Sequence, residues 1–112
     1  MSLKAAALVQ GVQLPSSVAA QYTCPANMSV IIRHAVFTNT TAGAITVTAY
    51  VVPSGGSVGD PTTVLDAFSI AGKTAYTSPE LSGVVLATGD TLQCFASGAT
   101  SVSLNVSGIQ QT

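Results

Sequence analysis

Apolar and polar residues alternate with a period of two along most of this chain, which is the pattern of β-strands rather than of helices. The clearest case is the segment 101–109, in which nearly every second residue is apolar. Here Val102, Leu104 and Val106 alternate with Ser101, Ser103, Asn105 and Ser107. A helix would scatter these side chains around its circumference, so the pattern predicts a strand with one face towards a core.

Two further segments, 29–39 and 44–52, alternate in the same way. In the first, strict alternation predicts one face with Val30, Ile32, His34 and Val36, and the other with Ile31, Arg33, Ala35 and Phe37. In the second, it predicts one face with Ile45, Val47, Ala49 and Val51, and the other with Thr46, Thr48 and Tyr50. Further strands are predicted at 3–12, 20–24, 63–68, 73–76, 83–86 and 91–96.

Turn-forming residues separate these segments, as in the hairpin-length stretch 39–43 and the longer Gly- and Pro-containing loop 53–61. Short strands with regular turns over about 100 residues predict an all-β fold, an antiparallel β-sandwich of about eight short strands in a single domain. Both a jelly-roll-like and an immunoglobulin-like arrangement fit the pattern. Residues 18–112 are expected to form this sandwich, and residues 1–17 are expected to be an N-terminal strand or a docking arm.

Charge changes the picture most, because only 6% of the 112 residues are charged and the formal net charge is −1. An ordinary soluble domain is about 25% charged. The charged residues are Lys4, Arg33, Lys73, Asp60, Asp66, Glu80 and Asp90. The polar surface must therefore come mainly from neutral side chains, which suit burial against other subunits. The alternative is a small neutral domain that simply tolerates such a surface.

The same scarcity of charge excludes two classes of partner. Nucleic-acid binding needs clustered Lys and Arg to neutralise phosphates, and the three cations lie in distant segments. Aromatic stacking is equally sparse, with three Tyr, three Phe and no Trp. No uninterrupted apolar run approaches the roughly 18 residues of a membrane-spanning helix. We therefore expect no nucleic-acid and no membrane partner.

Candidate chemistry is equally sparse. His34 is the one histidine in the sequence, lies in a predicted strand beside apolar residues, and is expected to be a packed or interface side chain. The carboxylates are isolated, and Asp60 and Asp90 are predicted to bond nearby backbone N–H groups in turns. A calcium site assembled from distant loops stays open, but no acidic cluster supports it. We expect no catalytic residues, no metal site and no cofactor, and hence no enzyme.

Cys24 and Cys94 are the two cysteines of the chain. Sequence alone does not show whether their Cα atoms come within the distance of a disulfide. Buried free thiols at strand positions are the simpler expectation, and two cysteines with one histidine do not make a structural zinc site.

Several turn-and-strand phrases carry a family resemblance. They are Tyr22-Thr23-Cys24-Pro25-Ala26-Asn27 before the apolar strand Ser29-Val30-Ile31-Ile32, Thr38-Asn39-Thr40-Thr41-Ala42-Gly43-Ala44, Val51-Val52-Pro53-Ser54-Gly55-Gly56, Gly89-Asp90-Thr91-Leu92 and Val102-Ser103-Leu104-Asn105-Val106-Ser107-Gly108. From about residue 20 onward, the chain resembles small β-sandwich proteins of tailed bacteriophages that serve as head-decoration, neck or tail accessory proteins. The resemblance implies a virion location and a structural role.

The sequence thus favours a bacteriophage virion accessory protein that assembles on the particle as a homo-oligomer, expected to be a trimer, beside the capsid, neck or tail proteins. The interface residues expected are Leu3, Lys4, Leu8, Gly55, Gly56 and Asp60. The alternative is a small carbohydrate- or host-surface-binding module of a tail fibre, with recognition in the loops 53–61 and 97–100. Few aromatic residues are available for such binding.

Overall fold

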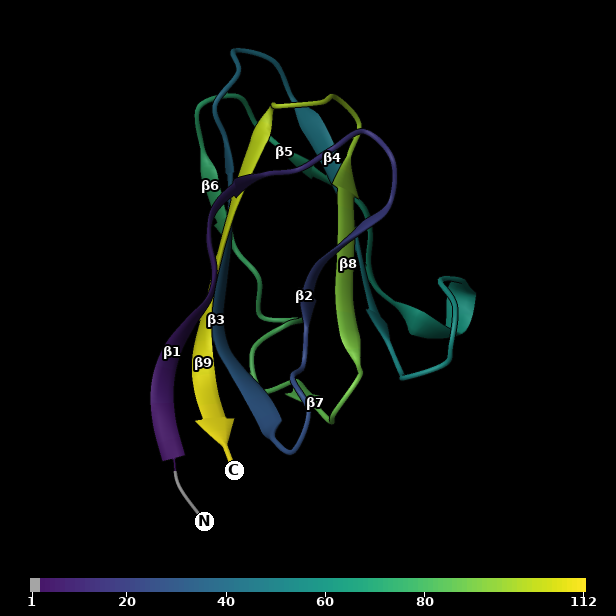
Figure 1. Cartoon of the computed structure of the whole chain (residues 1–112). Helices are drawn as coiled ribbons and strands as arrows, with labels where there is room; N and C mark the ends of the chain where they lie inside the picture. Colours follow the sequence, from purple (N-terminus) through teal and green to yellow (C-terminus); the bar gives the residue numbers. More distant parts are fainter. Residues whose placement is uncertain (1–2) are drawn as a thin grey trace.

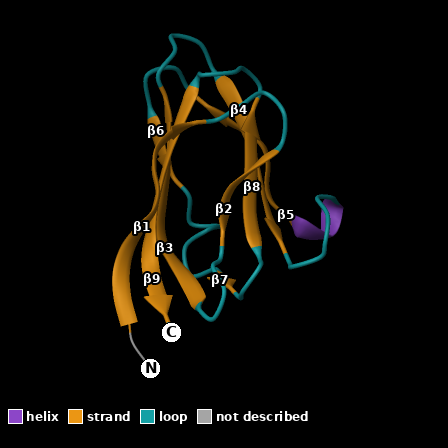
Figure 2. Ribbon diagram, in the orientation of Figure 1, coloured by secondary structure: helices purple, strands orange, loops and turns teal. Residues whose placement is uncertain are grey.

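A computed structural model describes residues 3–112, apart from the side chain of Asp60, and this part of the chain contains nine strands and one short 3-10 helix (Figures 1 and 2). The strands are β1 (Leu3–Gln13), β2 (Ala19–Thr23), β3 (Ser29–Asn39), β4 (Ile45–Val52), β5 (Thr63–Ile70), β6 (Ala75–Thr77), β7 (Val85–Leu86), β8 (Thr91–Ala96) and β9 (Val102–Gln111). The 3-10 helix η1 (Asp60–Thr62) precedes β5. The predicted all-β antiparallel sandwich is confirmed, with nine strands instead of about eight.

The strands form two antiparallel sheets. Sheet A has the order β1-β9-β3-β6, with β7 also paired to β3, and sheet B has the order β2-β8-β4-β5. The pairs are nested, because β1 joins β9, β2 joins β8, β3 joins β6 and β7, and β4 joins β5. A long hairpin rolled up in this way is a jelly roll. Of the two arrangements left open by the sequence, the jelly roll is therefore the one adopted.

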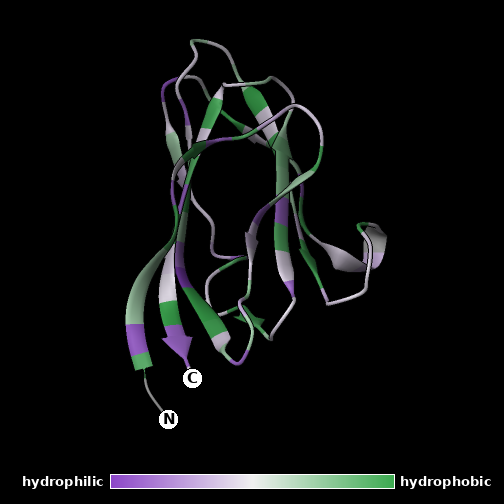
Figure 3. Cartoon of the chain, in the orientation of Figure 1, coloured by the Kyte–Doolittle hydropathy of each residue, from purple (hydrophilic) through white to green (hydrophobic). Residues whose placement is uncertain are grey.

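The hydrophobic core lies between the two sheets, where the inner faces meet. In β9, Val102, Leu104 and Val106 are buried while Asn105 and Ser107 are exposed, as the alternation predicts. Hydrophobic residues occur in the strands of both sheets (Figure 3), and the buried ones pack together in one core. The largest fully buried apolar side chains are Phe37, Leu14, Ile32, Leu81, Leu86, Leu92 and Leu104. At one edge of the sandwich, Phe68 of β5 stacks on Tyr76 of β6, with ring centroids 4.1 Å apart.

The prediction from strict alternation of which side chains share a face of β3 is wrong, because β3 contains a β-bulge. The register between β3 and β9 shifts between Ile32 and His34, so one residue of β3 is inserted there. Before the bulge, Ile32 faces the core, and after it Ala35 and Phe37 do. A bulge of this kind reverses the facing of all later side chains. Arg33 and His34 are both exposed as a result.

The end of β3 is joined to sheet B by a buried amide. The side chain of Asn39 is fully buried, and its Nδ2 donates hydrogen bonds to the carbonyl oxygens of Gly43 (2.8 Å) and Ile70 (2.9 Å). Its Oδ1 accepts hydrogen bonds from the backbone N–H of Thr41 (2.9 Å) and from the Thr41 hydroxyl (2.7 Å). The Asn39 side chain thus makes hydrogen bonds both to the β3–β4 turn and to Ile70, the last residue of β5.

Candidate functional site

A row of apolar residues crosses the outer face of sheet A, at the end of the sandwich where the C-terminus lies. Ala5 of β1 pairs with Ile109 of β9, Ile109 pairs with Ile31 of β3, and Ile31 pairs with Val85 of β7. Directly opposite residues in antiparallel strands project from the same face. Because Val30 and Ile32 on either side of Ile31 are buried, these four residues, here called the apolar row, point away from the core.

The side chains of the apolar row are exposed or half-exposed to solvent. Val85 is 60% exposed, and Leu3, at the start of β1, is 64% exposed. Ala5 is exposed, while Ile31 and Ile109 are half-buried. The hydrophobic colour near the ends of β1, β9 and β3 in Figure 3 marks the same part of sheet A. An apolar surface that spans several strands of a soluble domain is typical of a site that contacts another protein.

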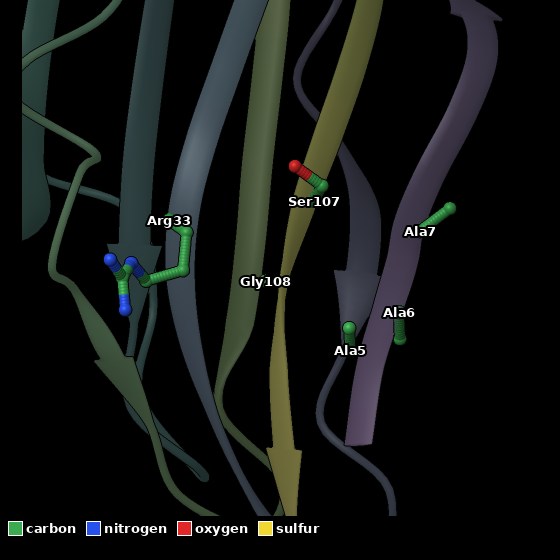
Figure 4. A pocket seen from close by; sticks show the side chains of 6 residues that line it. All are labelled: Ala5, Ala6, Ala7, Arg33, Ser107 and Gly108. Carbon is green, nitrogen blue, oxygen red and sulfur yellow. The ribbon is translucent and has the colours of Figure 1, made fainter. Parts of the chain in front are cut away.

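A shallow depression lies beside the apolar row. It is lined by Ala5, Ala6, Ala7, Arg33, Ser107 and Gly108 (Figure 4). The floor carries small side chains, because alanines of β1 lie opposite Ser107 and Gly108 of β9. The guanidinium group of Arg33 points away from these residues in Figure 4. The depression is therefore lined mainly by small side chains, and no charged group points into it in Figure 4.

The interface residues expected from the sequence fall into two separate groups. Leu3, Lys4 and Leu8 lie on β1, the outermost strand of sheet A. Leu3 and Lys4 are exposed, whereas Leu8 packs partly against the core of its own chain. Gly55 and Gly56 lie in the exposed turn after β4, with Asp60 at the start of η1. Figure 1 shows this connection on the opposite side of the molecule from β1, so the two groups do not form one surface.

None of the four residues of the apolar row is among the interface residues expected from the sequence, although their neighbour Leu3 is. The members of the row come from four segments that are distant in sequence, and only the strand register places them side by side. A signal was present in Ile109, an apolar residue on the polar face of its segment, which also carries Asn105 and Ser107. Such residues are easily dismissed, because isolated exposed apolar side chains are common in soluble proteins.

His34 was expected to be a packed or interface histidine, and the packed alternative is wrong. The bulge in β3 places its side chain on the outer face of sheet A, opposite Ser107. Together with Gln10 and Asn105 it lines a second small depression next to the first. These neighbours are neutral, so nothing in the described part of the site marks His34 as a catalytic base.

Asp90 acts as the turn residue that the sequence predicts. Its Oδ2 accepts a hydrogen bond from the Ala87 N–H (3.0 Å), and its Oδ1 accepts one from the Ser54 N–H (2.9 Å). The turn before β8 is thereby tied to the loop after β4. The corresponding expectation for the Asp60 side chain lies outside the described residues. Within the described part of the chain, no group of three His, Cys, Asp or Glu residues is placed to hold a metal ion.

Glu80 is held by local hydrogen bonds. Its Oε1 accepts them from the hydroxyls of Tyr76 (2.7 Å) and Ser78 (3.0 Å). The bond from Tyr76 is the main reason why the pKa of Glu80 lies below its ordinary value. This carboxylate therefore serves the connection between β6 and β7 as a hydrogen-bond acceptor.

Both cysteines are buried free thiols, as expected, but Cys94 lies in β8 whereas Cys24 follows the last residue of β2 and is not in a strand. The Sγ of Cys24 lies 3.4 Å from the carbonyl oxygen of Met28 and 3.5 Å from that of Leu86. Burial, with a further contribution from the Asp90 carboxylate, raises the pKa of Cys24. Burial alone raises the pKa of Cys94 to about 12. Neither thiol is therefore activated as a nucleophile.

Cys94 is expected to make the protein less stable as the pH rises above about 9. The unfolded thiol loses its proton near 9.0, whereas the folded thiol keeps it up to about 12, so alkali favours the unfolded state between these values. Urea unfolding of wild type and Cys94→Ala, from about pH 8 to about pH 11, measures this. We expect the free energy of unfolding to fall more steeply with pH in the wild type. Equal slopes would contradict the expectation.

The fold and its outer surface define a jelly-roll β-sandwich with an exposed apolar row and few charges. This fold is similar to part of a chain in each of two structures of infectious bursal disease virus. For the Gx strain, the TM-score is 0.52 at 14% identity, over 97% of this chain and 31% of that chain. For the Gt strain, the TM-score is 0.51 at 12% identity, over 97% of this chain and 32% of that chain.

This chain therefore spans about a third of the length of the virus chains that it resembles. At 12% and 14% identity, the likeness is one of fold alone. No protein-family model and no curated protein matches the sequence. Among residues 3–112, no helix is long and apolar enough to cross a membrane.

Proposed function

We propose that this protein is a structural component of a virus particle, resident in the virion, and that it works by assembling with copies of itself and with other virion proteins. The observation that carries the proposal is the apolar row, an exposed apolar strip across four strands in a chain that is 6% charged. Burial of such a strip against a neighbour stabilises an assembly by roughly 25 cal/mol per Å² of apolar area.

Two further observations support this role. Jelly rolls are a recurrent architecture of viral capsid domains, although the same architecture also occurs in lectins. The likeness to a domain-sized part of chains from virus structures agrees with the first of these uses. Because fold alone does not determine function, the exposed apolar surface is needed to favour assembly over ligand binding.

In its finer form, the proposal is an accessory protein of a tailed bacteriophage, at the head surface, the neck or the tail. The basis is the resemblance of the turn-and-strand phrases to such proteins, which extends from about residue 20 to the end of the chain. The role proposed is structural and not catalytic, since His34 and the carboxylates of the described residues serve no common site.

Mass spectrometry of purified particles, from the phage or virus whose genome encodes this chain, tests the proposed function. We expect the polypeptide to co-purify with particles through a density gradient, at a constant ratio to the major capsid protein. A matched control is the soluble fraction of the same lysate. A polypeptide present only in that fraction would contradict the proposal.

The alternative of a carbohydrate- or host-surface-binding module has less support. The loops 53–61 and 97–100 contain no aromatic residue on which a sugar ring would stack. Tyr50 and Phe95 do form a stacked pair in sheet B, with ring centroids 6.5 Å apart, but each is partly buried by its neighbours. The assembly proposal therefore accounts for more of the surface.

A further inference from the structure

The open edges of the two sheets differ in how well they are protected against pairing with another strand. A bare edge presents unpaired N–H and C=O groups, which are a template for a further strand unless the edge is short, bulged or charged. In sheet A, the edge opposite β1 is formed by β6 and β7, which are three and two residues long. These strands are too short to bind a partner strand along their length.

Both edges of sheet B are irregular. At β2, five residues long, the register with β8 shifts between Ala20 and Tyr22. At β5, the register with β4 shifts twice, and Ala67 has a left-handed backbone with a φ of 47° beside the exposed carboxylate Asp66. Bulges of this kind bend a strand and misalign its outward-facing backbone groups. Sheet B therefore offers no straight edge among the described residues.

The first half of β1 is neither short nor bulged. From Leu3 to Ala7, five successive residues pair with β9 from Gln111 to Ser107 without a shift, and this stretch is here called the β1 edge segment. The first register shift comes only after Ala7. The segment carries one charged side chain, Lys4, and three consecutive alanines that leave the backbone accessible.

We propose that the β1 edge segments of two copies of this chain pair with each other, antiparallel, around a two-fold axis at Ala5. This inference rests on the proposed function, of which it names one assembly contact. A second copy is the fitting partner because its own straight open edge, within the described residues, is the same segment. The resulting contact is self-complementary and closes on itself.

The side chains fit this register. With Ala5 opposite Ala5 of the second copy, Leu3 faces Ala7 and Lys4 faces Ala6, so that no two charges meet. A register centred on Lys4 would place two ammonium groups directly opposite, which destabilises a strand pair. Pairing at Ala5 also joins the two apolar rows, because Ala5 is the end of the row nearest to the axis. Sheet A then continues from one copy into the other, and the expected unit is a dimer instead of the trimer expected from the sequence.

Cross-linking at the axis tests this contact in the full-length chain. In Ala5→Cys, the two introduced thiols lie on opposite strands at about 5 Å between Cβ atoms. A short bis-maleimide is expected to convert most of the protein to a covalent dimer. The matched control is Ala75→Cys, an exposed alanine of the opposite edge strand β6, which is expected to stay monomeric on a denaturing gel. The native thiols are buried and do not compete.

A charge variant gives an independent measurement. Ala5→Lys places like charges opposite each other, so we expect light scattering after gel filtration to show a several-fold lower dimer fraction than for wild type. Ala75→Lys is expected to leave the dimer fraction unchanged. Unfolding midpoints close to wild type would show that both variants are folded.

The inference is overturned if Ala5→Cys cross-links no better than Ala75→Cys, or if wild type is monomeric at every concentration tested. In either case, particles that contain the polypeptide would leave the proposed function standing with a different contact. A cross-linked dimer that is absent from particles would instead support the edge contact and count against the virion role.

Discussion

Gly108→Ala is expected to destabilise the protein by about 3 kcal/mol or more, because a Cβ at this position has no room. Gly108 lies in β9 between β1 and β3, and a Cβ added there would sit 2.2 Å from the carbonyl oxygen of Ile31 and 3.1 Å from its carbonyl carbon. The obstacle is backbone in the centre of sheet A, so relief requires one strand to move. Thermal unfolding followed by circular dichroism should show a midpoint more than about 10 °C lower.

Gly43→Ala is the matched control for this substitution. Gly43 lies in the exposed β3–β4 turn, and a Cβ built there meets no atom within 4 Å. We expect its free energy of unfolding to stay within about 0.5 kcal/mol of wild type. If the two variants are equally stable, β9 and β3 do not lie as close together at Gly108 as the structure shows.

Asn39→Ala is the second substitution with a large expected effect, a loss of about 3 kcal/mol. The variant removes two donated and two accepted hydrogen bonds at once, and leaves the carbonyl oxygen of Ile70 without its bond to the Asn39 amide in the interior. A buried polar group left without its partner costs more than the bond itself contributed. Urea unfolding should therefore show a lower midpoint.

Asn105→Ala supplies the comparison for the buried amide. The Oδ1 of Asn105 accepts one hydrogen bond from the Gly11 N–H (2.8 Å), but the side chain is exposed and water replaces the lost partner. Its expected cost is about 1 kcal/mol or less. Equal losses for the two variants would show that burial of Asn39 contributes nothing beyond ordinary hydrogen bonding.

Period-two patterning predicted the elements of this fold well, because most strands have one face in the core. In β9, Val102, Leu104 and Val106 are buried as expected, and the predicted segments correspond to all nine strands. The pattern holds no information on which strands pair. The nested order of the jelly roll depends on contacts between distant segments, so a jelly-roll-like and an immunoglobulin-like arrangement both fit the sequence pattern.

The errors in facing have a local cause. The bulge at Arg33 inserts one residue into β3, which reverses the facing of His34, Ala35, Val36 and Phe37 relative to strict alternation. Two consecutive polar residues inside an apolar strand, Arg33 and His34, were the available sign of this bulge. A bulge lets both project outward, whereas regular pleating would place one of them in the core.

The candidate site was predicted only in part. Low charge directed attention to neutral surfaces that would suit assembly, and Leu3, one of the expected interface residues, lies next to the apolar row. The apolar row depends on the register between four strands, and this register cannot be predicted from the pattern within any one segment. The role of Gly55, Gly56 and Asp60 in an interface stays a prediction. The connection between β4 and β5 that contains them lies on the side of the molecule away from β1 (Figure 1).

The nested pairing has a consequence for how the chain matures. Among the described strands, β1 pairs only with β9, and the seven other strands lie between these two in the sequence. Such a high contact order is associated with slow folding, and sheet A is not completed until β9 is available for pairing. The β1 edge segment is therefore ordered by pairing only once β9 has been made, so a chain that stops before β9 lacks the edge proposed for contact between copies.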